Sequence, residues 1–398
     1  MPLKPADPAT APLGSGSVPL AATAWAAGPG AASAAVVQAI DELGGATPSI
    51  VLVFPDWALP SHAAFLDAAA ALPDGCLVAG ATSHGVFTAG GPHRAGCAAV
   101  AFGPEIEAGV GVAAGASADL RRAGRAAAEA ALEGLDPRPG HGVVLLLVDP
   151  GSGDQAAAVD GAYEVVRARL PLAGGGANGP EPRVLCPQGV QADAVVAVVL
   201  SSPQPVSLAV ADGCHPRGIP AIATRTAGRA LLELDGRPAE QVYLEGLGAD
   251  GAPPLGDEAF ERLAVLHPLG QPELRGTLRL RHVIGRADGG GLACATTIPA
   301  NAAVWVTEQS QDSIVDSARA AASEASALLP GPPRAVLAFD CAARRRALDG
   351  EVDHEVAALL EGLDGQPPVL GVYTRGEIGR TRGAKGDRNH AVVVVGFR

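Results

Sequence analysis

The side chains best suited to chemistry in this sequence follow an apolar run at 369–373. Thr374, Arg375 and Glu377 supply a hydroxyl, a cation and a carboxylate, and Gly376 lies between the last two. Glycine permits a positive φ and close approach of the backbone, so it is typical of tight turns. A tight turn needs glycine but does not need three different polar side chains. The pattern therefore predicts a turn that also binds a ligand.

Cys341 and Arg344 form a second group of this kind, directly after an apolar run at 335–339. A helical pattern at 350–363 connects this run to the one at 369–373, so the two strands are expected to be neighbours. In open α/β sheets, ligands bind beyond the carboxyl ends of the strands. Both groups of side chains are therefore expected at one edge of a sheet.

The combined chemistry would suit a small zwitterion. Arg344 and Arg375, together with backbone N–H groups of the turn, would attract a carboxylate or a phosphate. Glu377 could receive an ammonium group. The predicted ligand is an amino acid or a similar small anion.

Structural roles stay open for the same residues. Glu377 could pair only with an arginine to close the turn, and Thr374 could cap it. Cys341 could be a small core residue, as free cysteine often is. The cations at 344–346 would stand at the start of a helix, where they oppose the helix dipole, and this makes a purely solvated role less favourable.

The glycine turn occurs three times along the chain. In the segment 77–87 the residues that match 371, 374, 375 and 376 are Gly80, Ser83, His84 and Gly85. A weaker copy spans 172–179, and each copy is followed by an apolar strand, at 97–102, 194–200 and 391–397. The recurrence predicts duplication of a β-hairpin-like unit, with chance similarity of glycine-rich turns as the alternative. Gly80, Ser83, His84 and Gly85 are thus a second candidate ligand-binding turn.

Two further turns carry polar side chains. The turn 149–154 follows an apolar strand and resembles a phosphate cradle. No lysine follows it, so the pattern favours an ordinary strand-to-helix connection with Asp154 as helix N-cap. Cys214 and His215 are adjacent in another turn. Adjacent residues of an extended chain point apart, which favours a turn over a nucleophilic pair.

Composition excludes several classes of protein. The 398 residues are 48% hydrophobic and 3% aromatic, with a formal net charge of −13. This charge argues against binding to nucleic acid, which needs clustered Lys and Arg, and against binding to an anionic membrane. No apolar run approaches the ~20 residues of a membrane span. The six cysteines are scattered and the nine histidines are not closely spaced, so we expect reduced thiols in a cytoplasm, no metal site and no cofactor.

Helix and strand patterns alternate along most of the chain. Helices are predicted at 30–43, 61–72, 118–132, 312–329 and 350–363, after a disordered lead-in at 1–20. The strands at 97–102 and 106–112 are expected to pair around the turn 103–104, and 277–284 alternates as one half-exposed strand. The pattern predicts an α/β fold, with α+β as the variant, in two related mixed-sheet domains with helices packed on the sheets.

The C-terminal segments resemble those of a known family. LAFDCAAR at 337–344, VLGVYTRGEIG at 369–379 and Asn389 before an apolar strand are similar to the C-terminal FIST domain. The first half resembles the N-terminal FIST domain in its glycine turns at 80–83 and 174–176, in the segment around Cys214 and in LDGRPA at 234–239. One departure is Val86-Phe87 after the first turn, where the family often has an acidic residue.

The resemblance implies an N-terminal FIST domain at 21–220 and a C-terminal one at 221–398. It also implies a sensory module of bacterial signal transduction, more often a binding protein than an enzyme, whose output partner would be a separate protein. The ligand-binding residues expected in the C-terminal domain are Cys341, Arg344, Thr374, Arg375, Gly376, Glu377 and Asn389. A protein-interaction scaffold without a small ligand, and an enzyme that uses Cys341 as nucleophile, are the alternatives.

Overall fold

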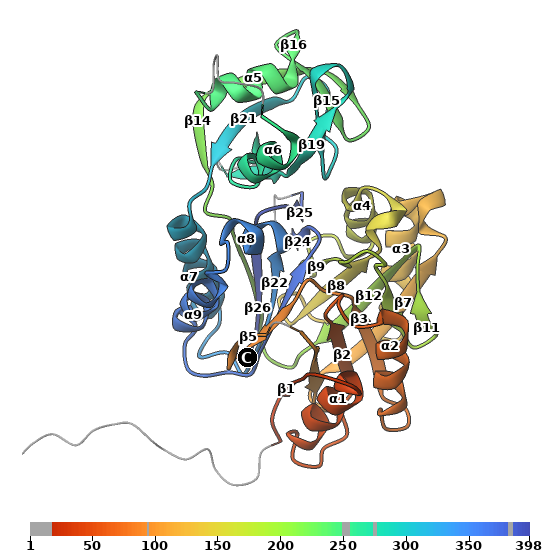
Figure 1. Ribbon diagram of the computed structural model, residues 1–398. Helices are drawn as coiled ribbons and strands as arrows, with labels where there is room; N and C mark the ends of the chain where they lie inside the picture. Colours follow the sequence, from red (N-terminus) through yellow and green to blue (C-terminus); the bar gives the residue numbers. More distant parts are fainter. Residues whose placement is uncertain (1–17, 94, 249–254, 274–276, 381–384) are drawn as a thin grey trace, which may run out of the picture.

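The computed structural model describes residues 18–93, 95–248, 255–273, 277–380 and 385–398 (Figure 1). Its strands form three six-stranded sheets and one larger antiparallel sheet, with helices packed on them. The prediction of a mixed α/β fold is confirmed. No helix in the described part of the chain is both long and apolar enough to cross a bilayer. The lead-in predicted at 1–20 lies almost entirely outside the described residues.

Three repeats of one unit build the body of the molecule, each in the order strand, helix, strand, helix, strand, hairpin, strand. The first contains β1 (Ala21–Ala26), α1 (Ala31–Asp41), β2 (Ile50–Pro55), α2 (Ser61–Ala70), β3 (Leu77–Ala81), β4 (Val86–Thr88), β5 (Gly91–His93) and β6 (Cys97–Phe102). The second contains β7 (Glu107–Ala114), α3 (Leu120–Ala131), β8 (Gly142–Val148), α4 (Gln155–Val166), β9 (Leu172–Gly176), β10 (Val184–Cys186), β11 (Gly189–Gln191) and β12 (Ala194–Ser201). The third contains β13 (Val206–Ala211), α7 (Gln311–Ala327), β22 (Ala335–Cys341), α8 (Ala342–Ala347), α9 (Val352–Gly362), β23 (Val369–Thr374), β24 (Glu377–Arg380), β25 (Asp387–Arg388) and β26 (Val392–Phe397).

The same strand pairing forms the centre of each repeat. β2 lies between β3, which is parallel to it, and β6, which is antiparallel. β8 has the same neighbours in β9 and β12, and β22 has them in β23 and β26. The expectation that the strands at 335–339 and 369–373 are neighbours is therefore confirmed.

Each repeat sends its hairpin into the sheet of another repeat. β4 of the first repeat pairs with β23 of the third, β10 of the second pairs with β3 of the first, and β24 of the third pairs with β9 of the second. The exchange closes into a ring. Each six-stranded sheet therefore contains strands from two repeats.

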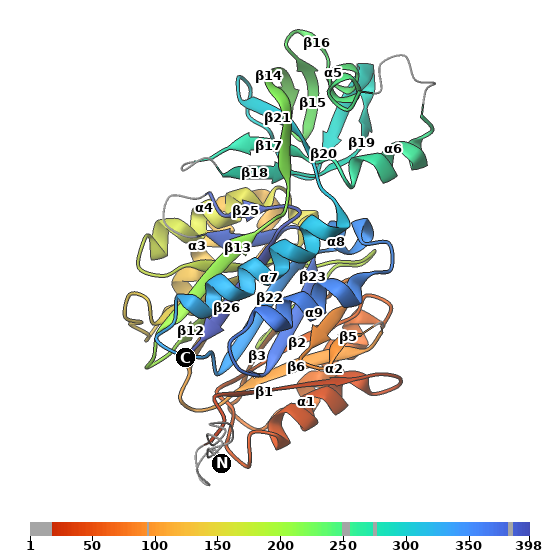
Figure 2. The same cartoon turned by 90° about the vertical axis from the view of Figure 1, so that its left-hand side faces the viewer.

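The three sheets pack around a common core and carry their helices on the outside. The inner faces contribute Phe54, Leu147 and Phe339 to one continuous apolar cluster. The outer faces are covered by α1 with α2, α3 with α4, and α7 with α9; Figure 2 shows the last pair in front of β22 and β26. Strands buried on both faces need apolar side chains at every position, which explains the unbroken runs in β8 and β12.

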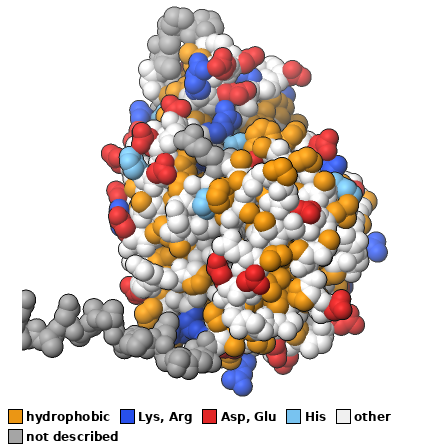
Figure 3. All heavy atoms as spheres, turned by 60° about the horizontal axis from the view of Figure 1, so that its bottom comes forward, with side chains coloured by type: hydrophobic (Ala, Val, Ile, Leu, Met, Phe, Trp, Pro, Cys, Tyr) orange, Lys and Arg blue, Asp and Glu red, His pale blue; other side chains and the backbone are white. Residues whose placement is uncertain are grey.

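An insertion between β13 and α7 forms a separate small module above the body (Figure 1). It contains β14 (His215–Ala227), β15 (Ala230–Leu234), β16 (Arg237–Pro238), α5 (Ala239–Gly246), α6 (Asp257–Ala264), β17 (Leu269–Pro272), β18 (Leu278–Arg281), β19 (Val283–Ala287), β20 (Gly291–Cys294) and β21 (Ala303–Glu308). Its own core includes Tyr243, Phe260 and Leu292. Figure 3 shows the face of the molecule away from this module, where hydrophobic side chains are scattered among acidic and basic ones.

Two local expectations were wrong. The strands at 97–102 and 106–112 do not pair, because β6 already has a partner on both edges and β7 pairs with β12 in another sheet. The alternating segment 277–284 is two strands, β18 and β19, which interrupt at His282 and pair with different parts of the large sheet. The domain boundary at 220/221 stays a prediction; β13 on one side of it pairs with β26 on the other.

Candidate functional site

The three glycine turns meet where the carboxyl ends of β3, β9 and β23 converge. A ring of backbone hydrogen bonds joins them, and each repeat donates one N–H to a carbonyl of another repeat. The bonds run from His84 N–H to Tyr373 O (2.9 Å), from Asn178 N–H to Thr82 O (2.8 Å) and from Arg375 N–H to Gly176 O (2.9 Å). The three copies seen in the sequence are therefore structurally equivalent.

The three residues that donate these backbone hydrogen bonds also have their side chains in one cavity. Each donor is followed by a glycine in the left-handed region, and these glycines are Gly85, Gly179 and Gly376, with φ of 111°, 115° and 81°. A residue with a side chain adopts this conformation only with strain. The equivalent side chains His84, Asn178 and Arg375 all line the same cavity.

The cavity lies between the body and the insertion and has a volume of about 300 Å³. Its cationic lining residues are Arg229, Arg346 and Arg375, and no Asp or Glu of the described residues lines it. Within the described ranges, the guanidinium groups of Arg229 and Arg375 have no hydrogen-bond or ion-pair partner. The uncharged polar lining residues are His84, Gln155, Asn178, His282, Cys341, Thr296, Thr374 and Asn389. The electrostatic character of this lining favours an anion.

The structure brings most of the predicted C-terminal residues together at this cavity. Its lining includes Cys341, Thr374, Arg375, Gly376 and Asn389. Contact of these residues with a ligand stays a prediction.

Arg344 and Glu377 do not line the cavity; both side chains are fully buried beneath it. Their contact with a ligand also stays a prediction, and the present geometry gives them protein partners instead. The following paragraphs describe those partners.

The second candidate turn reaches the cavity only through His84, which stacks on Trp57 with ring centroids 5.5 Å apart. Ser83 is buried and donates to Pro55 O at 3.0 Å. A Cβ at position 80 would lie 2.0 Å from a backbone oxygen of β2, so Gly80 allows close packing of the strands. Gly85 lies under the guanidinium of Arg345, which donates to His84 O at 2.7 Å.

Arg344 lies at the centre of a fully buried polar network. Its Nη2 is 2.7 Å from Glu355 Oε1, and its Nε is 3.0 Å from Asp340 Oδ1. The remaining donors bond to Ser317 Oγ (3.0 Å) and to backbone carbonyls of 212 and 314. A planar guanidinium can satisfy this many acceptors at once, whereas the ammonium of lysine cannot.

Glu377 has no arginine partner in the described structure. Its carboxyl accepts from Thr374 Oγ1 at 3.3 Å and from Ala391 N–H at 3.2 Å, and it hydrogen-bonds the thiol of Cys341. Burial raises the pKa of Glu377 to about 8, although these hydrogen bonds oppose the shift. Burial and the neighbouring Glu355 also raise the pKa of Asp340 well above its usual value. Burial thus favours the neutral form of both Glu377 and Asp340 beside the guanidinium of Arg344.

The buried Glu377 predicts a stability that falls as pH rises. In the folded protein the pKa of Glu377 is about 8, above its usual value of 4.5. The folded state therefore binds this proton more tightly than the unfolded state, and the stability gained from it is lost as the pH rises from 4.5 to 8. The histidines at 282 and 390, whose pKa values are lowered, act in the opposite direction only below pH 6.5. Between pH 6.5 and 8 we expect the unfolding free energy to fall by about 1.4 kcal/mol per pH unit more in the wild type than in Glu377→Gln.

Urea unfolding across this pH range measures that difference. The exposed Glu361→Gln on α9 serves as the matched control and should keep the wild-type slope. Equal slopes in the wild type and Glu377→Gln would contradict a protonated Glu377.

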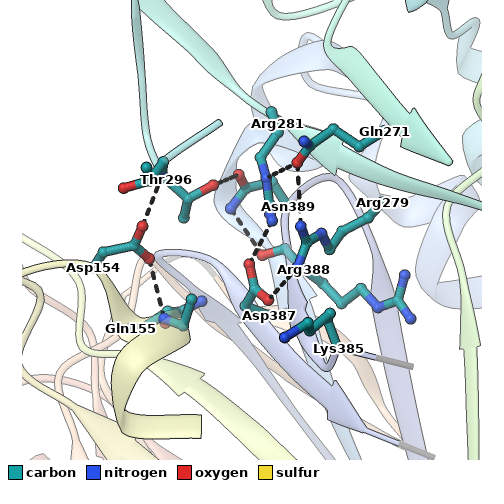
Figure 4. A network of polar contacts seen from close by, with 12 residues as sticks. Asp154, Gln155, Gln271, Arg279, Arg281, Thr296, Lys385, Asp387, Arg388 and Asn389 are labelled. Atoms are coloured by element: carbon teal, nitrogen blue, oxygen red, sulfur yellow. Dashed lines mark hydrogen bonds and ion pairs between the residues drawn. The ribbon is translucent and has the colours of Figure 1, made fainter. Parts of the chain in front are cut away.

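A second polar network joins the insertion to the body beside the cavity (Figure 4). Asp387 on β25 lies 2.7 Å from Arg281 Nη2 and 3.1 Å from Arg279 Nη1, both on β18. Gln271 Oε1 accepts from Arg281 Nε at 3.0 Å. Arg388 extends the network to an ion pair with Glu273 at 2.9 Å.

Further single hydrogen bonds join the insertion to the body along the rim of the cavity. Asn389 Oδ1 accepts from His282 N–H at 3.1 Å and from Thr296 Oγ1 at 3.4 Å. Asp154 caps α4, as predicted, and its other oxygen accepts from Thr297 N–H at 2.7 Å. Cavity residues on the insertion are therefore held in a fixed place relative to those of the body.

Several lining residues were not identified from the sequence. Asn178 could have been identified, because in the glycine turn 172–179 it occupies the position that His84 and Arg375 have in the other two turns. His282, Thr296 and Arg229 belong to the insertion, and no local pattern indicates that this module covers the turns. Among the described residues, no cluster of three His, Cys, Asp or Glu side chains is placed to hold a metal ion.

Comparison with known proteins identifies the class to which this architecture belongs. The FIST N domain matches residues 49–237 and the FIST C domain matches residues 239–380. The chain belongs to the FIST family, whose domains are associated with signal transduction.

Similar chains occur in mycobacteria. The uncharacterized protein Rv0628c of Mycobacterium tuberculosis (strain ATCC 25618 / H37Rv) is 29% identical over 254 residues, which are 62% of this chain and 65% of that protein. The uncharacterized protein Mb0898c of Mycobacterium bovis is 30% identical over 218 residues, 52% of this chain and 54% of that one. The matched part thus spans less than two thirds of each relative.

One solved structure is similar over most of its length. A cyanuric acid hydrolase from A. caulinodans covers 96% of this chain and 99% of its own, with a TM-score of 0.39 and 10% sequence identity. A likeness of this extent carries no inference about activity.

Proposed function

We propose that this protein is a sensory protein of bacterial signal transduction that binds an amino acid or similar small anion in the cavity between the body and the insertion. The observation that supports this most is the lining, in which three arginines have no acidic lining partner. Charge-assisted hydrogen bonds from arginine to carboxylate or phosphate are among the strongest that proteins make. A bound ligand would contact all three repeats and the insertion at once, and a separate output protein would read the resulting change.

The lining favours the anionic group of the ligand over an ammonium group. The one carboxyl expected to receive an ammonium, Glu377, is buried and bonded to Thr374 and Ala391. An ammonium group would instead have to use neutral acceptors such as Asn178 or a backbone carbonyl. Simple carboxylates and phosphates are therefore the first ligands to screen, with amino acids second.

Arg375→Ala is expected to weaken binding of such a ligand by roughly 10- to 150-fold, because one charge-assisted hydrogen bond contributes about 1.5–3 kcal/mol. The measurement is a thermal-shift panel of small carboxylates, phosphates and amino acids, followed by calorimetric titration of the compounds that raise the melting temperature. Arg125→Ala, an exposed arginine on α3, is the matched control and should bind as the wild type does. A panel in which no compound raises the melting temperature would contradict the proposal.

An enzyme that uses Cys341 is the second candidate function, because the thiol lines the cavity and hydrogen-bonds the carboxyl of Glu377. Burial and the nearby Glu377 raise the pKa of the Cys341 thiol well above its usual value. A nucleophilic cysteine needs a lowered pKa. We therefore expect iodoacetamide to alkylate Cys341 more slowly than free cysteine at pH 7.5, as followed by peptide mass spectrometry with Cys214 as internal comparison. Alkylation faster than that of free cysteine would favour the enzyme.

A further inference from the structure

A chain of side-chain hydrogen bonds runs from the buried body to the cavity wall. Gln309 Nε2 donates to Asp212 O at 2.9 Å, and Gln309 Oε1 is 3.2 Å from His390 Nδ1. His390 Nε2 is 2.8 Å from His282 Nδ1, and His282 lines the cavity. Neither the glycine turns nor the arginines explain this relay.

The relay fixes the tautomer of both histidines. The carbonyl of Asp212 can only accept, so the amide nitrogen of Gln309 faces it and the amide oxygen faces His390. His390 Nδ1 must then carry a hydrogen, which leaves His390 Nε2 as the acceptor for His282 Nδ1–H. A neutral His282 consequently carries its hydrogen on Nδ1 and a lone pair on Nε2.

Both rings are neutral at physiological pH. Burial, together with the charges of Arg346 and Arg375, lowers the pKa of His282 to about 4. Burial, His282 and Arg344 lower the pKa of His390 well below its usual value. The charged and titratable groups that act on the pair are these three arginines and the neighbouring histidine ring.

His282 Nε2 has no hydrogen-bond partner among the described residues. An acceptor that stands beside two arginines cannot bind the charged oxygens of an anion, because lone pairs repel each other. It can bind an N–H or O–H of the same molecule. The arginines and His282 therefore recognise different groups of one ligand.

We propose that the cavity selects small anions that also carry a hydrogen-bond donor, with the donor bound to His282 Nε2 and the charge bound by Arg346 and Arg375. The class includes hydroxy acids and acids with a secondary amide. This inference rests on the proposed function and adds the second group that a ligand must have. An anion that lacks the donor would leave a desolvated acceptor unsatisfied, which reduces affinity by roughly tenfold or more.

The tautomer is tested first, on the full-length protein, by long-range ¹H–¹⁵N correlation spectra of the histidine rings. The expected spectrum shows His282 protonated at Nδ1 and unprotonated at Nε2. Gln309→Met, which removes the end of the relay, should produce a mixture of tautomers. A wild-type His282 protonated at Nε2 would overturn the proposal without reference to any ligand.

Ligand selection is tested with two pairs of acids in which a methyl group replaces the hydrogen of the donor: glycolate against methoxyacetate, and N-acetylglycine against N-acetylsarcosine. In calorimetric titrations the donor-bearing member of a pair should bind the wild type roughly tenfold or more tightly. His282→Phe should abolish this preference while binding of the donor-free acid is kept, and His354→Phe, on the exposed surface of α9, should retain it. If His282→Phe does not fold, Gln309→Met should reduce the preference.

The outcomes separate this inference from the proposed function. Equal affinity of the wild type for both members of each pair would overturn donor selection and leave anion binding intact. No binding of any of the four acids, together with no response in the wider panel of carboxylates and phosphates, would overturn both.

Discussion

Arg344→Met is expected to destabilise the protein by about 3–5 kcal/mol, the usual cost of removing one partner from a buried ion pair. The guanidinium is the only cation that contacts Glu355 and Asp340 among the described residues, and all three side chains are fully buried. Without it, neither buried carboxyl would have a cationic partner. Two backbone carbonyls and Ser317 would also each lose one donor.

Urea unfolding followed by circular dichroism measures this effect. Arg346→Met is the matched control, since it changes the same residue type on the same short helix. The side chain of Arg346 is 53% exposed, and its guanidinium makes a long ion pair of 3.9 Å with Glu261. Surface ion pairs of this kind contribute about 0–1 kcal/mol. A loss of less than 1 kcal/mol in Arg344→Met would show that the network does not need its cation. The comparison also separates stability from binding, because Arg346 lines the cavity and Arg344 does not.

Asp387→Asn should have an effect of similar size, about 3–5 kcal/mol, but at the junction of the insertion with the body. The substitution keeps the shape of the side chain and removes the charge that faces Arg279 and Arg281. Arg281 is almost fully buried, and burial already lowers its pKa. Among the described residues, the side-chain partner that both arginines would keep is the neutral Gln271.

Asp387→Asn should increase local opening at this junction more than it increases opening of the body. Hydrogen exchange is expected to accelerate in β17, β18 and β25, while the amides of β8 and β12 keep their wild-type rates. Asp257→Asn, whose carboxyl pairs with Arg286 at a side chain 89% exposed, is the matched control and should change neither exchange nor stability by more than about 1 kcal/mol. Unchanged exchange in β18 of Asp387→Asn would contradict a role of this pair in holding the insertion.

Much of the fold could be predicted from local sequence patterns. Runs such as 143–148 and 335–339 are apolar at every position because both faces of their sheets are covered. Such a strand can be recognised in the sequence even when the strands that pair with it are unknown. The glycine turns were identifiable because positive φ and close strand contact restrict the residue type. Pairing between distant strands was not predictable. The turn at 103–104 looks like a hairpin, yet it connects two sheets, since the neighbours of β6 and β7 lie elsewhere in the sequence.

The candidate site could likewise be predicted only in part. Cys341, Thr374 and Arg375 were placed correctly at neighbouring strand ends, because two parallel strands joined by a helix must end at the same edge. The orientation of Arg344 was not predictable, because it turns away from that edge toward Glu355 and Ser317 on helices that local patterns do not place. His282 was read as one residue of an alternating strand, although it interrupts the strand and faces the cavity.

The exchange of hairpins between repeats has a consequence for how the chain folds. β26 pairs on one side with β13, so that Val206 is opposite Phe397, and on the other side with β22. Contacts between residues so far apart must close a long loop before they gain any energy, which slows folding. During synthesis the sheet of the first repeat can gain its β10 from the second. The hairpin of β4 and β5, however, lacks the neighbour on its other edge until β23 has left the ribosome. The nascent first repeat therefore exposes the open edge of β4 for most of translation, a state in which chains readily aggregate or need a chaperone.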